Sequence, residues 1–364
     1  MKLENLNRDS QYLLIISTIL LCVGIVMIYS ASSCYAYEQY NDGAYYLKRH
    51  LVHFIVGLLL ARFFLQKDYR NLKKYAKILL AVSIVGLVLA LLPGIGREAG
   101  GAKRWVKLGF IGFQPSEFAG FFLIVYVADI LDRKQHVIRS FTQGFMPPLM
   151  VLGFSVLLIL LQPDLGSSVC ILAVGLVMMF VAGVNMVYFL PFLVPLIPIF
   201  YFLVFKVAYR LRRIASYLDP WSDTQGAGFQ IIQSFLALGS GGIFGLGLGC
   251  SKQKLFYLPQ AHTDFIFSII GEEVGLIGTL SITALFVLFI WFGIQVSIKA
   301  KDLFGRFLAL GITASIGLKA VINIAVSTGA IPTKGLPLPF ISYGGTALIF
   351  SIISVAILIN ISNS

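Results

Sequence analysis

The residues best suited to chemistry lie in a short polar segment, 258–267 (LPQAHTDFIF), which contains one acid, Asp264, and one histidine, His262. A long apolar run follows, so a carboxylate here must be desolvated at a cost in free energy and is expected to have a function. An ionised Asp264 is suited to act as a general base that takes a proton from an attacking hydroxyl. His262 is suited to orient a substrate.

Two other roles fit the same pattern. Aspartate is a preferred helix N-cap, and Thr263 or Asp264 would cap the helix expected from 265 onward, an interpretation that the residues alone support equally well. His262 and Asp264 together could also ligate a metal, but one histidine and one acid are too few to define such a site. We therefore expect no metal centre.

The composition excludes an ordinary soluble domain. Of 364 residues, 58% are hydrophobic and 12% are charged, whereas soluble domains carry about 25% charged residues. Apolar runs near the length that spans a bilayer recur throughout the chain, and their lengths favour helices over barrel strands. The expected spans are 12–31, 51–66, 76–93, 114–131, 146–161, 167–186, 187–205, 265–296, 304–327 and 340–360. The sequence thus predicts an all-α polytopic membrane protein, one domain over 1–364, with about ten transmembrane helices and a large extracytoplasmic loop, about 206–264, between helices 7 and 8.

The positive charges orient the chain. The first apolar run, Tyr12 to Ile28, is too long for the core of a signal peptide and predicts a retained helix. If the N-terminus is cytoplasmic, inner and outer segments each hold 13 lysines and arginines, so the total does not decide. The first hairpin decides the orientation, because segment 67–77 holds five lysines and arginines and segment 32–50 holds two. Positive residues are enriched on the cytoplasmic side. We expect both termini in the cytoplasm and the site on the outer face.

The outer segments are unexpectedly basic. Phospholipid headgroups explain some of these charges, but an anionic ligand such as a lipid-linked pyrophosphate explains why they lie outside. A nucleic acid is not indicated in a membrane protein of this kind. The outer basic residues considered for this role are ten of the 13: Arg97, Lys103, Arg104, Lys107, Arg210, Arg212, Arg213, Lys252, Lys254 and Lys334.

Other polar residues are expected to serve structure. Glu117 and Asp164 each follow a Gln-Pro pair, and both are expected to form buried ion pairs with an arginine or lysine. Four polar residues lie within the apolar runs and should face the bundle interior, where they would join helices: Glu272, Glu273, Lys319 and Asn323. The four scattered cysteines are expected to be packing residues.

Several motifs together resemble one family, the SEDS proteins (shape, elongation, division and sporulation). They are GAKRW at 101–105, QPSE at 114–117, QPDLG at 162–166, HTDF at 262–265 and the run 323–346, which contains PLPFISYGG. The resemblance covers essentially the whole chain. Segments 219–223 (DPWSD), 257–259 (YLP) and 332–337 (PTKGLP) look more like the division and sporulation branch, FtsW and SpoVE, than like the elongation branch, RodA.

The resemblance implies a peptidoglycan glycosyltransferase that uses lipid II, with Asp264 as its catalytic residue. It implies no tightly bound cofactor, with Mg²⁺ or Mn²⁺ as an optional divalent cation. The implied partners are lipid II, a class B penicillin-binding protein (a transpeptidase), divisome proteins and membrane lipids. The residues expected to contact substrate are Lys103, Arg104, Glu117, Arg210, Arg213, Lys252, His262, Lys334 and Ser342.

The chain departs from the family pattern at one position. The family usually has a lysine three residues after the glutamate of the Gln-Pro-x-Glu motif, and here that residue is Gly120. Glu117 must then pair with Lys103, Arg104 or another cation.

Two alternatives remain at this point. A lipid II flippase would use intramembrane residues such as Glu273 and Lys319 and would not need Asp264. A non-catalytic scaffold for a transpeptidase would need neither.

Overall fold

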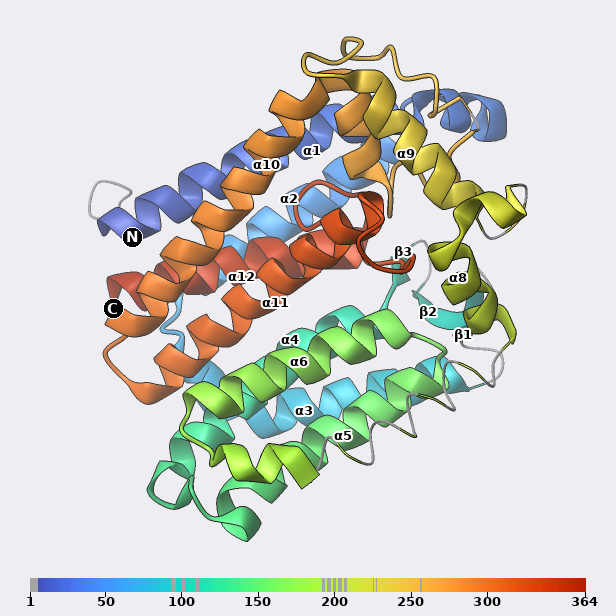
Figure 1. Cartoon of the computed structure of the whole chain (residues 1–364). Coiled ribbons are helices and arrows are strands. Elements are labelled where there is room, and N and C mark those ends of the chain that lie inside the picture. Colours follow the sequence, from blue (N-terminus) through green and yellow to red (C-terminus); the bar gives the residue numbers. More distant parts are fainter. Residues whose placement is uncertain are drawn as a thin grey trace.

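The computed structural model describes residues 6–92, 96–99, 102–108, 111–191, 208–224, 226, 228–255 and 257–364, with the single residues 194, 198, 201 and 205. Most of these residues form a bundle of long helices, shown in Figure 1. The long helices are α1 (Arg8–Tyr40), α2 (Tyr45–Gln66), α3 (Arg70–Leu91), α4 (Pro115–Arg133), α5 (Met146–Leu161), α6 (Leu165–Val181), α10 (Ile266–Lys299), α11 (Leu303–Ser327) and α12 (Gly345–Asn363). The shorter helices are η2 (Gln135–Val137), η3 (Phe141–Phe145), η4 (Met186–Tyr188), α8 (Ala208–Leu218), η5 (Pro220–Asp223) and α9 (Phe229–Gly241).

The apolar runs form helices because only helices satisfy their own backbone hydrogen bonds where water is absent. Within the described residues, seven helices are long and apolar enough to cross a membrane: α1, α2, α3, the continuous helix Phe141–Leu161, α10, α11 and α12. The polytopic helical fold is therefore confirmed. The expected span 187–205 falls largely outside the described residues, so the count of ten helices and the numbering of the loop stay predictions.

Helix α11 lies at the centre of the bundle. It packs against α10 on one side and against α4 and α6 on the other, while α12 packs against α2. Buried apolar side chains from α4, α6, α10, α11 and α12 form one large cluster, which includes Phe307, Leu308 and Ile312 of α11. Because α11 contacts both halves of the bundle, polar groups on it can join segments that are far apart in the sequence.

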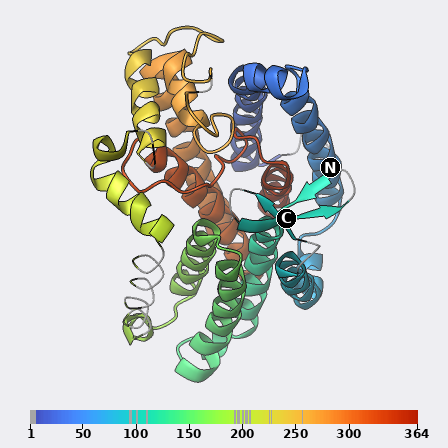
Figure 2. The ribbon, with the colours of Figure 1, turned by 90° about the vertical axis from the view of Figure 1, so that its right-hand side faces the viewer.

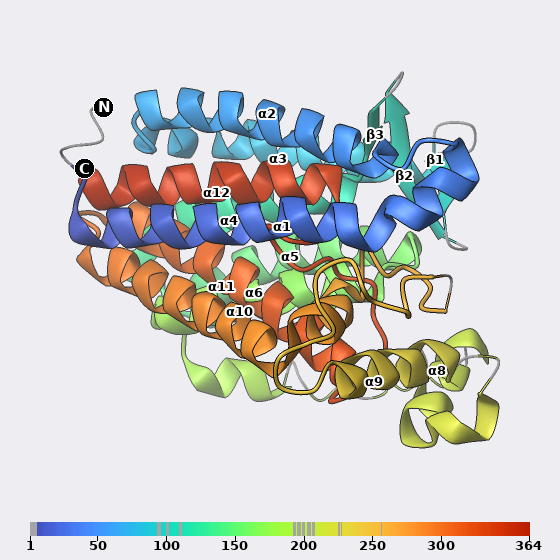
Figure 3. The same ribbon diagram turned by 90° about the horizontal axis from the view of Figure 1, so that it is seen from above.

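The two ends of the bundle differ. Both termini lie at one end, and a small sheet, α8, α9 and the connections before α10 and α12 lie at the other, as Figures 1 and 3 show. Figure 2 looks onto this second end. The sheet is antiparallel in the order β1 (Gly96–Ala99), β2 (Ala102–Leu108) and β3 (Ile111–Phe113). The expected spans 76–93 and 114–131 left this interval without a predicted element, and the sheet lies in it.

Helix α10 is interrupted near its start. Gly275 has φ 75° inside the helix, and the glycine-rich segment 242–247 fits into the break. The Leu246 N–H donates to the Glu272 carbonyl at 2.9 Å, and the Leu276 N–H donates to Gly242 at 2.9 Å. A Cβ on Gly275 would lie 2.4 Å from the Gly245 nitrogen, so only glycine permits this close approach. Segment 242–247 therefore packs directly against the interrupted turn of α10.

Candidate functional site

Two connections meet at the second end of the bundle, one before α10 and one before α12. The Asn323 side-chain amide, from α11, donates to the backbone carbonyls of Asp264 and Leu336, each at 2.8 Å. The Tyr343 N–H donates to the His262 carbonyl at 2.9 Å. One buried amide thus fixes both connections, which confirms the prediction that Asn323 faces the interior and joins elements.

Ser342 adds a second link between the same connections. Its hydroxyl donates to the Thr263 carbonyl at 2.6 Å and accepts the Leu338 N–H at 2.8 Å. The side chain is buried. The structure therefore gives Ser342 a positioning contact, where the sequence predicted a hydroxyl that touches substrate.

The connections enclose a cavity of about 520 Å³, which lies within the range of small-molecule binding pockets. Its lining includes the acids Asp264 and Glu117, His262, and Lys334. Other lining residues are Trp105, Gln114, Gln260, Thr333, Gly335 and Tyr343. Four residues predicted to act in the site, from three separate parts of the sequence, therefore share one cavity.

Asp264 does not cap helix α10. The N-cap is Phe265, whose side chain makes no capping hydrogen bond. The carboxylate instead lies against the backbone of Gly335, where an added Cβ would come within 2.9 Å of Oδ2. The capping interpretation left open by the sequence is therefore not supported, and Asp264 faces the cavity.

His262 lies among aromatic rings. Its imidazole is 4.5 Å from the ring of Tyr46 and 5.9 Å from that of Tyr343, between centroids. Burial lowers the pKa of His262 to about 4, so the ring is neutral near pH 7. A neutral imidazole can orient a hydroxyl by hydrogen bonding, but it supplies no positive charge.

Lys334 is a cation within the cavity. Burial lowers the pKa of its ammonium below the usual lysine value. Among the described residues, no carboxylate lies within ion-pair distance of Lys334. Its ammonium is therefore suited to meet an anionic group of a ligand.

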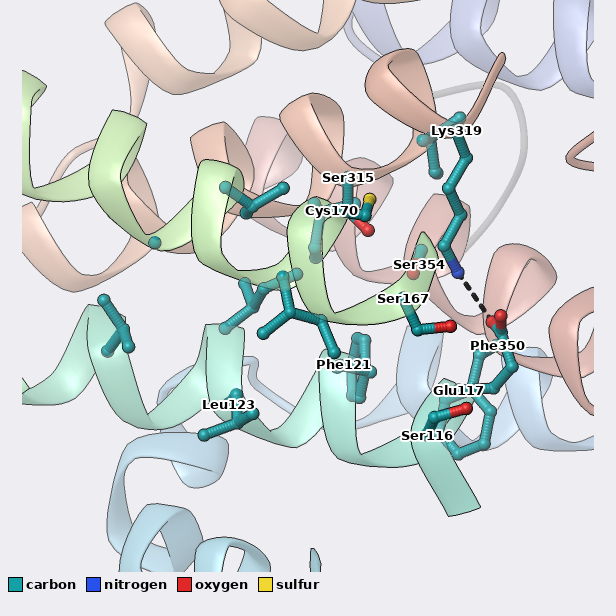
Figure 4. Close-up of a pocket in the computed structure, with 18 of the residues that line it drawn as sticks. Ser116, Glu117, Phe121, Leu123, Ser167, Cys170, Ser315, Lys319, Phe350 and Ser354 are labelled. Carbon is teal, nitrogen blue, oxygen red and sulfur yellow. Dashed lines mark hydrogen bonds and ion pairs between the residues drawn. The ribbon is translucent and has the colours of Figure 1, made fainter. Parts of the chain in front are cut away.

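Glu117 pairs with Lys319. The Lys319 ammonium of α11 lies 2.6 Å from the Glu117 carboxylate of α4, and Figure 4 shows the pair beside Ser116 and Ser167. The pair borders a smaller cavity of about 50 Å³, also lined by Gly120. Lys319 is thus the cation that pairs with Glu117 in this chain, where Gly120 stands in place of the family's lysine.

Asp164 departs from its prediction of an ion pair. Its carboxylate accepts the Ser167 N–H at 3.1 Å and the Ser167 hydroxyl at 2.9 Å, so it caps α6. No ion pair of Asp164 is present among the described residues. Capping satisfies the buried carboxylate with hydrogen bonds alone.

A second buried ion pair joins the large loop to the bundle. Lys254 lies 2.8 Å from the Glu273 carboxylate, and the Ser30 hydroxyl of α1 donates to that carboxylate at 2.7 Å. Glu273 is thus an interior polar contact, as predicted. Lys252 has an exposed side chain and its backbone N–H donates to Glu272 at 2.9 Å. It does not line the cavity with Asp264.

Other predicted contacts cannot be placed on this cavity. The side chains of Lys103, Arg104, Arg210 and Arg213 lie outside the described residues, so their contacts with substrate stay predictions. Gly335 and Tyr343 also line the cavity but were not predicted as site residues. Both lie in segments already recognised as family motifs, PTKGLP and SYGG, and this was the only sequence feature that could have indicated them. Within the described chain, no group of three or more His, Cys, Asp and Glu side chains is arranged to hold a metal ion.

Comparison with known proteins decides the family. A family model described as "Cell cycle protein", which covers FtsW, RodA and SpoVE, matches residues 11–364. The chain belongs to this family. The resemblance to the SEDS proteins is therefore confirmed.

The relatives lie on the division and sporulation branch. The chain is 48% identical to the "Probable peptidoglycan glycosyltransferase FtsW" of Geobacter sp. (strain M18), covering 96% of this chain and 95% of that protein. It is 42% identical to the "Stage V sporulation protein E" of Bacillus subtilis (strain 168), covering 96% of this chain and 96% of that protein.

Solved structures share the fold. One chain from work described as "Structural coordination of polymerization and crosslinking by a peptidoglycan synthase complex" superposes with a TM-score of 0.80 at 29% identity, covering 96% of each chain. The rod shape determining protein RodA of Thermus thermophilus gives a TM-score of 0.70 at 26% identity, covering 96% of this chain and 95% of that one.

Proposed function

We propose that this protein is a peptidoglycan glycosyltransferase that polymerises lipid II into β-1,4-linked glycan strands. Its relatives in Geobacter are named as probable peptidoglycan glycosyltransferases, which supports the proposed reaction class. The observation that carries the proposal is the position of Asp264, which faces a ligand-sized cavity and does not cap its helix. A carboxylate that faces such a cavity is positioned to act as a general base on a bound hydroxyl.

In the proposed reaction, Asp264 takes the proton of the acceptor sugar's 4-hydroxyl. The hydroxyl oxygen attacks the anomeric carbon of a polyprenyl-pyrophosphate donor, and a new C–O bond forms as the bond to pyrophosphate breaks. The configuration at carbon inverts, and the lipid pyrophosphate leaves with the bonding electrons. Proton removal by a positioned base contributes about 10²–10⁴-fold to such a rate. Direct displacement requires one base, unlike the paired carboxylates of glycoside hydrolases.

The cations of the site would stabilise the departing pyrophosphate. Lys334 lines the same cavity as Asp264, and a partly desolvated ammonium acts more strongly on developing negative charge than an exposed one. Lys103, Arg104, Arg210 and Arg213 are proposed to add to this field from the surrounding segments. His262, neutral at pH 7, would orient a sugar hydroxyl.

The cavity could hold a divalent cation through the Asp264 carboxylate, but phosphate groups of the substrate would have to supply further ligands. Mg²⁺ is commonly held by one or two carboxylates together with substrate phosphates, and the cavity lining offers the Asp264 carboxylate. The Glu117 carboxylate is engaged by Lys319. Bound Mg²⁺ or Mn²⁺ would neutralise pyrophosphate charge. The protein's own residues would still hold the sugar and remove the proton.

The membrane placement is part of the proposal. With both termini in the cytoplasm, the cavity lies at the outer face of the bacterial cytoplasmic membrane, where lipid II and the basic segments would meet. The polyprenyl tails would remain in the bilayer. The proposed partners are a class B penicillin-binding protein and divisome proteins, in keeping with the synthase complex that shares this fold.

The flippase alternative has lost its main support. The intramembrane residues that would line a transport path are paired within the bundle, Lys319 with Glu117 and Glu273 with Lys254. Structural pairing is a sufficient reason for their presence.

The test is polymerisation of labelled lipid II by the purified protein, alone and with its cognate transpeptidase. Asp264→Asn should form no glycan strands. Glu38→Gln, which removes an exposed carboxylate at the end of α1, should polymerise like the wild type. Strands formed by Asp264→Asn would overturn the proposed role of this residue.

A further inference from the structure

Helix α1 extends well beyond the bundle and carries tyrosines with it. Its 33 residues measure about 50 Å at 1.5 Å per residue, whereas the hydrocarbon core of a bilayer is about 30 Å thick. The last turns of α1 and the first turn of α2 therefore project at the end that bears the cavity, as Figure 3 shows. Five tyrosines lie on this hairpin: Tyr35, Tyr37, Tyr40, Tyr45 and Tyr46.

Three of these rings form a continuous line that begins at the cavity. Tyr46 packs edge-on against Tyr343, with centroids 5.0 Å apart, and Tyr343 lines the cavity with Asp264. Tyr45 meets Tyr46 edge-on at 5.3 Å, and Tyr40 stacks on Tyr45 at 3.8 Å. We call Tyr343, Tyr46, Tyr45 and Tyr40 the aromatic track.

The outer part of the track is accessible and has polar groups beside it. Tyr40 is 46% exposed. The guanidinium of Arg49 lies 4.5 Å from the centroid of the Tyr45 ring, and Lys48 and Asp42 form an ion pair at 2.7 Å on the same hairpin. Sugar rings present flat C–H faces bordered by hydroxyls. The exposed Tyr40 ring, together with the tyrosine hydroxyls and the charged neighbours, matches this mixed surface, because the ring is apolar and the hydroxyl is polar.

Tyrosines at a membrane interface often serve only as anchors among lipid headgroups. Anchoring does not explain why the rings contact one another in a line or why the line ends at the cavity. Tyr37 shows the difference, since it is 64% exposed and has no ring contact among the described residues. The contacts distinguish the track from a general aromatic belt.

We propose that the aromatic track binds sugar units of the glycan strand that lie beyond the two reacting sugars. This inference rests on the proposed function and adds a binding site to it. A strand held on the track stays close to Asp264 between successive additions. The track should therefore set the length of the strands and leave the chemical step at Asp264 unchanged.

The first test compares strand length with initial rate. Tyr40→Ala and Tyr45→Ala should shorten the strands about fivefold, the order expected from losing an aromatic stacking contact, while lipid II consumption in the first turnovers stays near the wild-type rate. The matched control is Tyr37→Ala, which should change neither quantity. Tyr40→Trp should retain long strands because it keeps an aromatic face.

The second test measures binding without catalysis. A soluble four-sugar fragment of peptidoglycan glycan would be added to the Asp264→Asn protein, and saturation-transfer NMR would report its contacts and affinity. Adding Tyr45→Ala to this protein should weaken binding about fivefold, and adding Tyr37→Ala should not.

Three results would overturn the inference. The first is unchanged strand length in Tyr40→Ala and Tyr45→Ala, and the second is fragment binding that is insensitive to Tyr45→Ala. The third is an equal loss of initial rate and strand length, which would mean that the rings only position the site. Failure of the proposed function is distinguishable from these. If the wild type makes no strands with its partner, the proposed function fails, and the binding measurement still decides whether the track holds a glycan.

Discussion

At the scale of single residues, the site depends on how Asp264 is held. Its backbone carbonyl accepts the Asn323 amide at 2.8 Å, and its carboxylate lies against Gly335. The sequence predicted Asp264 from its polar surroundings and its resemblance to a family motif. It could not predict Gly335 as a neighbour, because contact between residues 71 positions apart (335 minus 264) depends on the folded connections.

Gly335→Ala should impair the reaction without unfolding the protein. The new Cβ would lie 2.9 Å from the Asp264 Oδ2, so the carboxylate must shift. A displacement near 1 Å costs about 10²-fold in rate when a catalytic group is misplaced. The measurement is the initial rate of lipid II polymerisation. Gly239→Ala is the control, because nothing lies within 4 Å of a Cβ there, and equal rates for the two variants would contradict the account.

Lys334 should determine the alkaline limb of the pH–rate profile. Its lowered pKa means that the ammonium loses its proton as pH rises through a value below that of an ordinary lysine, so stabilisation of the pyrophosphate should be lost in that window. Lys334→Arg keeps its charge to higher pH and should move the fall in activity toward higher pH. An unshifted profile would show that Lys334 does not contribute this charge.

At the scale of elements, the Glu117–Lys319 pair joins α4 to α11 next to the cavity. The apolar runs predicted these helices well, because run length and the need for internal hydrogen bonds determine them. The pair itself was not predictable, since its members are 202 residues apart. The short sheet also escaped prediction, because its strands are brief and mix polar and apolar residues without clear alternation.

Breaking this pair on one side should destabilise the protein more than removing both charges. Lys319→Met leaves Glu117 buried without a cation, at a cost of about 3–5 kcal/mol. Adding Glu117→Gln should restore much of that loss, because no buried charge remains. The midpoint of thermal unfolding in detergent measures both effects. A double variant as unstable as the single one would indicate that the pair acts through packing alone.

At the scale of the whole molecule, charge and length determine how the chain lies in the membrane. Both termini are at one end, and the connections before α10 and α12, whose residues line the cavity, are at the other. The sequence predicted this separation from the basic residues of the first hairpin. It could not predict which loops would meet around Asp264, because α11 brings together connections that are distant in the sequence.

The orientation can be tested with introduced cysteines. In a variant whose four native cysteines are replaced by serine, Lys48→Cys should react with a membrane-impermeant maleimide added outside intact cells, and Lys67→Cys should react only after lysis. Both positions are exposed, at opposite ends of α2. The reverse labelling pattern would place the cavity in the cytoplasm and would exclude the proposed reaction on the outer face.

The most direct measurement of the central claim is strand formation and lipid II binding on the same purified samples, wild type and Asp264→Asn, each with the cognate transpeptidase. The account predicts long strands from the wild type, none from Asp264→Asn, and similar binding of lipid II by both. Strands of wild-type length from Asp264→Asn would contradict it, as would a loss of binding and folding together with activity.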